Sequence, residues 1–215
     1  MTKDETVPDW LRDLADAASK MEINPLAQPP ASGGRASAVL VLFGGGPDDP
    51  DLLFIQRSAD LRLHAGQPAF PGGAVDAEDG GPVAAALREA AEEVGVDPGS
   101  VDIVGVLPEL FIPRTGFRVV PVLAWWRQPS EVAPVDVGEV AAVERINVGE
   151  LADPAARLTV RGPSGFLSPA FQVRGMLIWG FTAALVDRLL ALAEWERPWD
   201  AARVADLEPS RWTGT

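Results

Sequence analysis

The sequence predicts a mixed α/β fold, and three observations support this class. Short apolar runs rich in β-branched residues, typical of buried strands, recur through the first three quarters of the chain. One amphipathic helix, Val83–Val94, interrupts them, and a longer apolar helix, Met176–Trp195, follows them. Strands, one helix, more strands and a final helix differ from the regular alternation that builds a doubly wound parallel sheet.

The segment before the first strand predicts a surface helix and a linker. Pro8–Lys20 has apolar residues at helical spacing, and a stretch rich in Pro, Gly and Ser follows it. We therefore divide the chain into an N-terminal helix and linker (residues 1–35), a main domain (36–195) and a C-terminal tail (196–215). The helix and the Trp-bearing tail after Glu194 could each support a homodimer or cover the core.

The main domain is expected to contain five long strands and a late hairpin. The strands are Ala36–Phe43, Asp51–Arg57, Val101–Leu110, Phe117–Trp126 and Glu139–Val148, and the hairpin joins Arg157–Val160 to Ala170–Val173. A turn around Thr115 and Gly116 connects two of the strands. The helix Val83–Val94 has Pro82 at its first turn and ends at Gly95, which is a normal stop.

Composition limits the function classes. The 215 residues carry a net charge of −13, which disfavours binding to a nucleic-acid polymer. The same charge would repel a phosphorylated small molecule unless local arginines or a divalent ion mediate the contact. There are no cysteines, so disulfides and thiolate metal sites are excluded. Neither a signal-peptide layout nor an apolar run of membrane-spanning length is found, so we expect no membrane association and a cytoplasmic location.

Three glutamates crowd the last turns of the helix Val83–Val94. Glu89, Glu92 and Glu93 are spaced so that they project from one helix face. Each like-charged pair costs roughly 0.2–0.5 kcal/mol, and the helix dipole adds a comparable penalty at this end. A divalent cation such as Mg²⁺ turns this repulsion into attraction, because it binds the carboxylate oxygens and substrate phosphates at the same time. The alternative is a solvated acidic face.

The context of these glutamates carries a family resemblance. Arg88, Glu89, Glu92, Glu93 and Gly95 form the pattern Arg-Glu-x-x-Glu-Glu-x-Gly, which resembles the core of the Nudix box. The resemblance implies an α/β/α sandwich around a mixed sheet. It also implies hydrolysis of a nucleoside diphosphate linked to another group, with Mg²⁺ or Mn²⁺ held by the glutamates. The pattern departs from the general box upstream, where Asp79 stands at the acid position and the stretch from Asp79 to Arg88 is one residue longer.

The stretch Leu53–Gly73 resembles the signature of the coenzyme A pyrophosphatase branch. The matched positions are Arg57, Ser58, Arg62, Gly66 and Phe70-Pro71-Gly72-Gly73. This likeness implies hydrolysis of coenzyme A, or a derivative, to adenosine 3′,5′-bisphosphate and 4′-phosphopantetheine. The alternatives are another substrate, such as ADP-ribose or a different nucleoside diphosphate derivative, and a Nudix-fold module that binds nucleotides without cleaving them.

The resemblance implies the following roles. Glu89, Glu92 and Glu93 are the expected metal ligands, and Glu92 is a ligand or the base. Arg88 is expected to orient the carboxylate of a glutamate by pairing with it. Arg57 and Arg62 are expected to contact substrate phosphates, and Gly72 and Gly73 to let the backbone approach the metal and phosphates. Glu139 could complete the metal site or act as base, and Glu144 is the second candidate for the same role. His64, the only histidine, is at most a neighbour of the substrate. Trp125, Trp126 and Trp179 could stack on adenine, although core or subunit contacts are the simpler interpretation.

Overall fold

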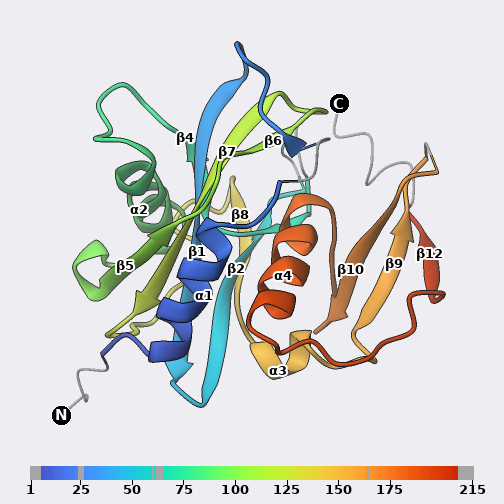
Figure 1. Ribbon diagram of the computed structural model, residues 1–215. Coiled ribbons are helices and arrows are strands. Elements are labelled where there is room, and N and C mark those ends of the chain that lie inside the picture. The colour runs from blue at the N-terminus through green and yellow to red at the C-terminus, as the bar shows by residue number, and fades with distance from the viewer. Residues whose placement is uncertain (1–5, 24–26, 60, 62–64, 164, 208–215) are drawn as a thin grey trace.

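The computed structural model describes residues 6–23, 27–59, 61, 65–163 and 165–207. Its main sheet has the strand order β3-β2-β1-β7-β5, with β4, β6 and β8 pairing β1, β7 and β2 respectively. Strands β1 and β7 run parallel, whereas β1 pairs antiparallel with β2 and β4. The sheet is therefore mixed, as the sequence predicts (Figure 1).

The elements have the following bounds. In chain order they are α1 (Asp9–Ser19), β1 (Arg35–Gly46), β2 (Asp49–Arg57), β3 (Pro68–Ala69), β4 (Gly72–Ala74), α2 (Pro82–Val94), the short 3-10 turn η2 (Pro98–Ser100), β5 (Val101–Val106), β6 (Leu110–Ile112), β7 (Phe117–Trp126), β8 (Val140–Asn147), α3 (Val148–Leu151), β9 (Arg157–Arg161), β10 (Leu167–Val173), β11 (Met176–Ile178), α4 (Gly180–Leu192) and β12 (Val204–Asp206).

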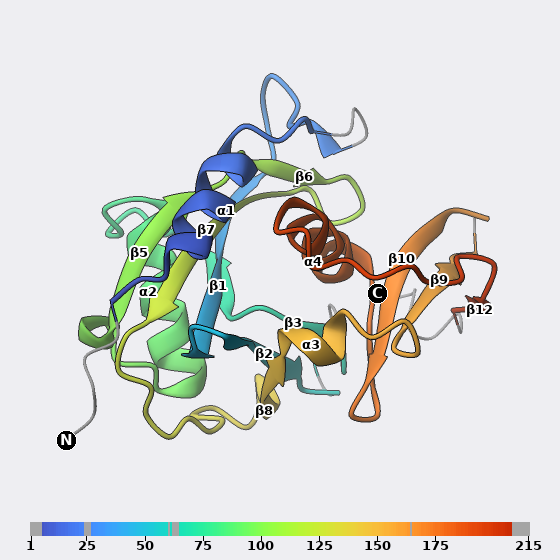
Figure 2. The same cartoon turned by 60° about the horizontal axis from the view of Figure 1, so that its bottom comes forward.

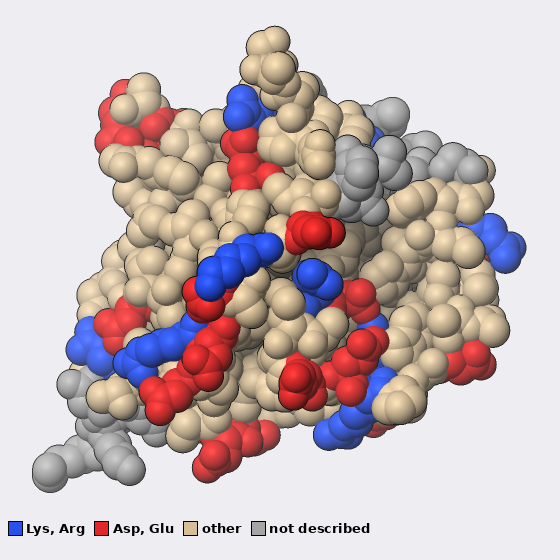
Figure 3. Space-filling model, in the orientation of Figure 1, with Lys and Arg blue, Asp and Glu red and all other residues tan. Residues whose placement is uncertain are grey.

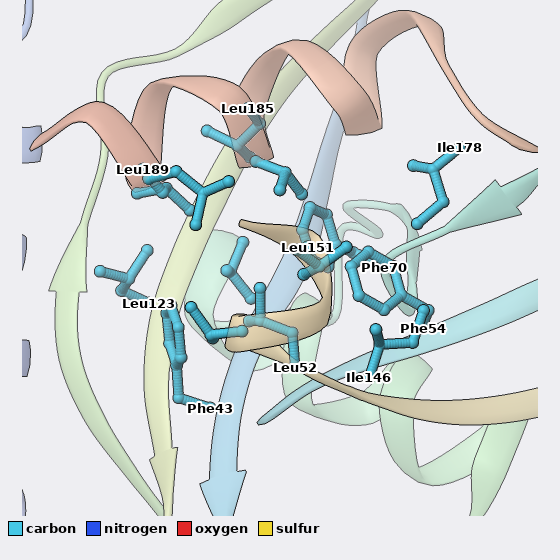
Figure 4. Close-up of a cluster of buried hydrophobic side chains, with 14 of the residues drawn as sticks. Phe43, Leu52, Phe54, Phe70, Leu123, Ile146, Leu151, Ile178, Leu185 and Leu189 are labelled. Carbon is cyan, nitrogen blue, oxygen red and sulfur yellow. The ribbon is translucent and has the colours of Figure 1, made fainter. Parts of the chain in front are cut away.

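Helices cover both faces of the main sheet. Alternate side chains of a strand point to opposite faces, so a strand covered on both sides is apolar throughout. In β1, Leu40 and Leu42 belong to the apolar cluster that contains α2, whereas Val41 and Phe43 belong to the cluster that contains α1, α3 and α4. Figure 4 shows the second cluster, with Leu185 and Leu189 of α4 above side chains of the sheet. The α/β/α arrangement that the family resemblance implies is confirmed.

The N-terminal helix is part of this second cluster. Leu11, Leu14 and Ala18 are buried in it, and Trp10 packs edge-on against Phe43 with ring centroids 5.4 Å apart. Of the two roles considered for this helix, covering the core is the one observed. Its exposed side carries ion pairs within the helix, and acidic and basic groups alternate over this face of the molecule (Figure 3).

A second, smaller sheet has the order β11-β10-β9-β12 and stands beside α4 (Figure 2). The expected hairpin is present as β9 and β10. The expected helix Met176–Trp195 is wrong in its first residues, because Met176–Ile178 forms strand β11 against β10. Gly180, with a φ of +65°, separates this strand from the rest of α4. Residues of the expected tail add β12, which runs parallel to β9.

Arg157 ties the C-terminal segment to the second sheet. Its side chain is 1% exposed and donates hydrogen bonds to Asp187 of α4 and to Glu196. The guanidinium also lies over the ring of Trp199, 4.5 Å from the centroid. A buried cation is tolerable only when its donors are paired, so this arrangement fixes residues 196–199 against β9.

No helix within the described residues is long and apolar enough to cross a lipid bilayer.

We predict that Leu14→Ala lowers the free energy of unfolding by about 2 to 5 kcal/mol, because Leu14 is fully packed in the core that α1 covers. Urea unfolding would measure this loss. Asp13→Ala, on the exposed side of the same helix, is the matched control and should change stability by no more than about 0.5 kcal/mol. Equal, small effects of the two substitutions would contradict the packing of α1.

Candidate active site

The acidic helix α2 packs against β4, a short strand of the main sheet that pairs with β1. Gly95 closes the helix in the left-handed conformation, with φ 75° and ψ 24°, and its N–H donates to the carbonyl of Ala91. This termination is the one expected from the sequence. It leaves the last two turns of α2 beside β4 and the loop that precedes β8.

Glu93 is buried against the backbone of β4. The residue is 3% exposed, and its Oε2 accepts a hydrogen bond of 3.0 Å from the N–H of Gly72. Its Oε1 lies 3.7 Å from Nη1 of Arg57. The contact requires glycine at position 72, where φ is +153° and a Cβ would lie 2.3 Å from the carbonyl oxygen of Ala38.

Glu89 lies one helical turn earlier and packs against the next glycine. A Cβ on Gly73 would approach Oε1 of Glu89 to 2.5 Å. The Glu89 side chain is 17% exposed and accepts a hydrogen bond of 3.1 Å from Nη1 of Arg88. Gly73 therefore admits Glu89 close to the backbone, whereas the missing side chain of Gly72 makes room for β1.

Arg88 joins the helix to the loop that precedes it. Its Nε and Nη2 donate to the two oxygens of Asp79 at 3.0 and 2.9 Å, which is a bidentate pair. Nη2 also donates to the carbonyl of Ala74, and Nη1 donates to Glu92 at 3.0 Å. Asp79 therefore holds Arg88, although its residue type and loop length depart from the general pattern.

Glu92 is more exposed than the other two glutamates, and it shares Nη1 of Arg88 with Glu89. Its side chain is 60% exposed and pairs with Arg88 on the outer side of the helix. Within the residues that the structure describes, no three acidic or histidine side chains are gathered closely enough to hold a metal ion. Glu92 can join Glu89 and Glu93 around an ion only by giving up its bond to Arg88.

Glu139 lies near Glu89 and Glu93, at the start of β8. Its negative charge contributes to raising the pKa of both of these carboxyls. The loop before it is tied to α2, because the N–H of Val135 donates to the carbonyl of Glu93. Asp136 then accepts from the N–H of Gly138 through its side chain and from the N–H of Glu139 through its carbonyl. We did not single out Asp136 from the sequence, although Asp-Val-Gly is a typical turn signal.

The other predicted site residues have different outcomes. Arg57 contacts Glu93, and its Nε is buried without a hydrogen-bond partner among the described residues. Arg62 and His64 lie outside the described residues. Glu144 pairs with Arg174 of the second sheet. Trp125 and Trp126 are buried in the core and are not available for stacking on a substrate, whereas Trp179 is partly exposed.

Burial sets the protonation of the glutamates. Desolvation raises the pKa of Glu93 to about 7, despite the opposing hydrogen bond from Gly72 and the charge of Arg57. Desolvation also raises the pKa of Glu89, and the bond to Arg88 opposes it. The Arg88 hydrogen bonds keep the pKa of Asp79 below its ordinary value. Glu89 and Glu93 thus form a desolvated pair of oxygen ligands, a donor set that suits a hard divalent cation.

The acidic helix α2 contacts the glycine strand β4 at the edge of α2 that carries Glu93. This arrangement in a mixed sheet is the one expected of a Nudix enzyme. A family model described as the NUDIX domain matches residues 34–163. A protein named uncharacterized Nudix hydrolase NudL from Cronobacter sakazakii is 41% identical over 177 residues, covering 76% of this chain and 85% of that protein. A protein of the same name from Klebsiella pneumoniae subsp. pneumoniae is 38% identical over 204 residues, covering 88% of this chain and 99% of its own.

A solved structure agrees on the fold. The Nudix hydrolase RenU from M. smegmatis superposes with a TM-score of 0.54 at 21% identity, covering 79% of this chain and 91% of its own. This chain belongs to the Nudix family. It is a Nudix hydrolase, and the family resemblance drawn from Arg88, Glu89, Glu92, Glu93 and Gly95 is confirmed.

We predict that the metal-free protein loses stability as pH rises between about 4.5 and 7. The folded-state pKa of Glu93, about 7, exceeds the unfolded value of 4.5, so the native state binds more protons in this window and unfolding becomes easier as pH increases. The loss is on the order of 3 kcal/mol. Urea unfolding at pH 5 and pH 8 in a chelator would measure it. Glu93→Gln should remove most of this dependence, whereas Glu78→Gln, at an exposed loop position, should leave it unchanged.

We also predict losses of stability of different size at the two glycines. Gly72→Ala should lower the free energy of unfolding by about 3 kcal/mol or more, because its Cβ would collide with the backbone of β1. Gly73→Ala should cost much less, because only the end of the Glu89 side chain must move. Thermal melts of both variants would compare them, with Gly80→Ala, which has open space, as control. A Gly72→Ala protein as stable as Gly80→Ala would disprove the close approach of β4 to β1.

Proposed function

We propose that this Nudix hydrolase cleaves the diphosphate linkage of a nucleoside diphosphate derivative, and that coenzyme A or one of its derivatives is the substrate. The observation that carries the proposal is the desolvation of Glu89 and Glu93 beside Gly72 and Gly73, where each carboxylate has one arginine nearby and Glu93 is 3.7 Å from its own. Two desolvated carboxylates of raised pKa are costly in a metal-free protein, and a divalent cation offsets that cost.

The ion is proposed to be Mg²⁺ or Mn²⁺. Glu89 and Glu93 would hold it, with Glu92 as a third ligand after exchange of its bond to Arg88. When bound, such an ion neutralises the diphosphate and lowers the pKa of water. Arg88 then serves as a positioning residue, because its pair with Asp79 keeps the guanidinium beside both Glu89 and Glu92.

Arg57 is proposed to bind substrate phosphate. Its Nη1 faces Glu93 while its buried Nε has no partner among the described residues, so the guanidinium has donors to spare. A planar guanidinium is suited to bidentate contacts with phosphate oxygens. The likeness of Leu53–Gly73 to the coenzyme A pyrophosphatase signature makes the same assignment and extends it to Arg62.

Glu139 is proposed as the base that accepts the proton of the attacking water, with Glu92 as the alternative. Glu139 is held beside the Glu89–Glu93 pair by the loop that is bonded to the end of α2. A general base must come within hydrogen-bond reach of the proton that it removes, and the end of a short, anchored loop meets this need. The cytoplasmic location and the homodimer considered from the sequence stay predictions.

A substrate panel tests the proposal. Coenzyme A, dephospho-coenzyme A and ADP-ribose would be incubated with the protein in Mg²⁺ and in Mn²⁺, and the products identified by mass spectrometry. The expected products from coenzyme A are adenosine 3′,5′-bisphosphate and 4′-phosphopantetheine. Preferential cleavage of ADP-ribose would move the assignment to the rival substrate. Binding of all three without any product would identify a nucleotide-binding module instead.

We predict that Glu93→Gln lowers kcat/KM on the best substrate of that panel by about 10²- to 10³-fold, because the amide loses the charge that faces the ion. Steady-state kinetics would measure the loss. The variant should also show a smaller rise in melting temperature on addition of Mn²⁺ than the unmodified protein, since it binds the ion less tightly. Glu78→Gln is the control and should retain both properties; normal turnover by Glu93→Gln would refute the metal assignment.

A further inference from the structure

The loop that joins β7 to β8, residues 127–139, is bonded to two elements of the candidate active site. The N–H of Val135 donates to the carbonyl of Glu93 at 3.0 Å, which ties the middle of the loop to α2. At the end of the loop, the carbonyl of Glu139 accepts a hydrogen bond of 2.8 Å from the N–H of Ser58, the residue that follows β2. The loop therefore bridges the acidic helix and the end of β2.

Asp136 forms a turn between these two anchor points. Its Oδ1 accepts a hydrogen bond of 2.8 Å from the N–H of Gly138. Its carbonyl accepts from the N–H groups of Glu139 and Val140 at 3.0 and 2.9 Å. An aspartate side chain that accepts from the backbone two residues later stabilises a turn in this way. Three successive amides are thus bonded to Asp136, and the last of them begins β8.

We propose that Asp136 is a positioning residue of this enzyme, whose turn sets the place of the Glu139 carboxylate beside Glu89 and Glu93. The inference rests on the proposed function, because it takes Glu139 to be the base. It assigns to Asp136 no contact with the substrate or with the ion, since the Asp136 carboxylate serves as an acceptor for the loop.

Glu139 depends on this turn because its side chain has little other support. Glu139 is exposed, and its carboxylate makes no hydrogen bond or ion pair among the residues that the structure describes. The place of the carboxylate is therefore set by the backbone that carries it. A misplacement of about 1 Å in a reacting group can lower a rate about 10²-fold, so a change in this turn strongly affects proton transfer.

The turn requires an acceptor at position 136 and not a negative charge. An asparagine side chain offers the same acceptor oxygen without the charge. The chain contains this version of the turn, since Oδ1 of Asn147 accepts the N–H of Gly149 at 2.6 Å. Asp136→Asn should therefore preserve the position of Glu139. Asp136→Ala removes the acceptor, and Asp136→Glu keeps the charge but moves the acceptor by one methylene group.

A matched control lies in another loop. Asp153, between α3 and β9, accepts from the N–H of Ala155 through its side chain at 2.8 Å and from the N–H of Ala156 through its carbonyl at 2.9 Å. It makes the same kind of turn outside the candidate active site. Asp153→Ala therefore reports the effect of losing such a turn without moving Glu139.

The test is steady-state hydrolysis by the full chain in Mn²⁺, with the best substrate of the panel. Asp136→Ala and Asp136→Glu should lower kcat about 10- to 10²-fold and leave KM within about twofold, because the base is displaced while the substrate still binds. Asp136→Asn should keep kcat within about threefold of the unmodified value, and Asp153→Ala should change neither constant. In a Glu139→Gln background, Asp136→Ala should lower kcat by less than about twofold more, since a residue that acts through Glu139 has nothing left to position.

Several results would overturn the proposal. They are a normal kcat in Asp136→Ala, a kcat in Asp136→Asn as low as in Asp136→Ala, normal turnover by Glu139→Gln, and losses that multiply in the double variant. If Asp136→Ala does not fold, as judged by circular dichroism, Asp136→Glu takes its place in each comparison. Failure of both variants to fold would identify a purely structural role and would also overturn the proposal.

Amide hydrogen exchange, followed by NMR without substrate or metal, examines the turn separately from hydrolysis. The amides of Glu139 and Val140 should exchange about tenfold or more faster in Asp136→Ala than in the unmodified protein, and at the unmodified rate in Asp136→Asn. Unchanged exchange in Asp136→Ala would contradict the role of the turn. A protein that cleaves no substrate of the panel loses the proposed function and the positioning role together. A protein that cleaves coenzyme A but shows multiplying losses keeps the proposed function and loses only the positioning role.

Discussion

The candidate site depends on the contact between Gly72 and β1. With a Cβ only 2.3 Å from the carbonyl oxygen of Ala38, no other residue could bring β4 this close to the central strand. The contact lets β4 pair with β1 and leaves the N–H of Gly72 facing α2, where Glu93 accepts its hydrogen bond. Through the bond between Gly72 and Glu93, this backbone approach helps to position the acidic helix against the sheet.

The electrostatics of α2 are divided between its two sides. On the outer side, Arg88 shares its donors among Asp79, Glu89 and Glu92, so the charges there are largely compensated. On the inner side, Glu93 is buried with a single backbone donor and a more distant arginine. The helix therefore retains uncompensated negative charge only where it faces the glycine turn. Under the proposed function, this asymmetry would direct a divalent cation to one place on a protein of net charge −13.

Sequence reasoning was most successful where local signals agreed. The helix α2 was predicted within one residue at its start, since its apolar period, Pro82 and Gly95 all indicate the same bounds. The long strands were found because they are apolar on both faces. The strand β11 was missed because Met176–Ile178 continues the apolar pattern of α4, and only its pairing with β10 separates the two. A short run of apolar residues cannot distinguish a buried helix from a buried strand.

The site was predictable in composition but not in orientation. The spacing of Glu89, Glu92 and Glu93 placed them on one helix face, yet Arg88 draws Glu92 outward, and no sequence pattern reports which partner an arginine selects. The roles of Glu139 and Asp136 depend on a loop that returns to α2 from forty residues away. Such long-range contacts are set by the tertiary fold, which local propensity does not encode.

The contacts that hold Arg157 have a consequence for folding during synthesis. The guanidinium is paired by Glu196 and stacked by Trp199, and β9 is flanked by β12, so these partners all follow β9 in the chain. The buried charge of Arg157 can therefore be matched in this way only after Glu196 and Trp199 have been synthesised. Until β12 has also left the ribosome, β9 lacks its parallel neighbour and the second sheet stays incomplete.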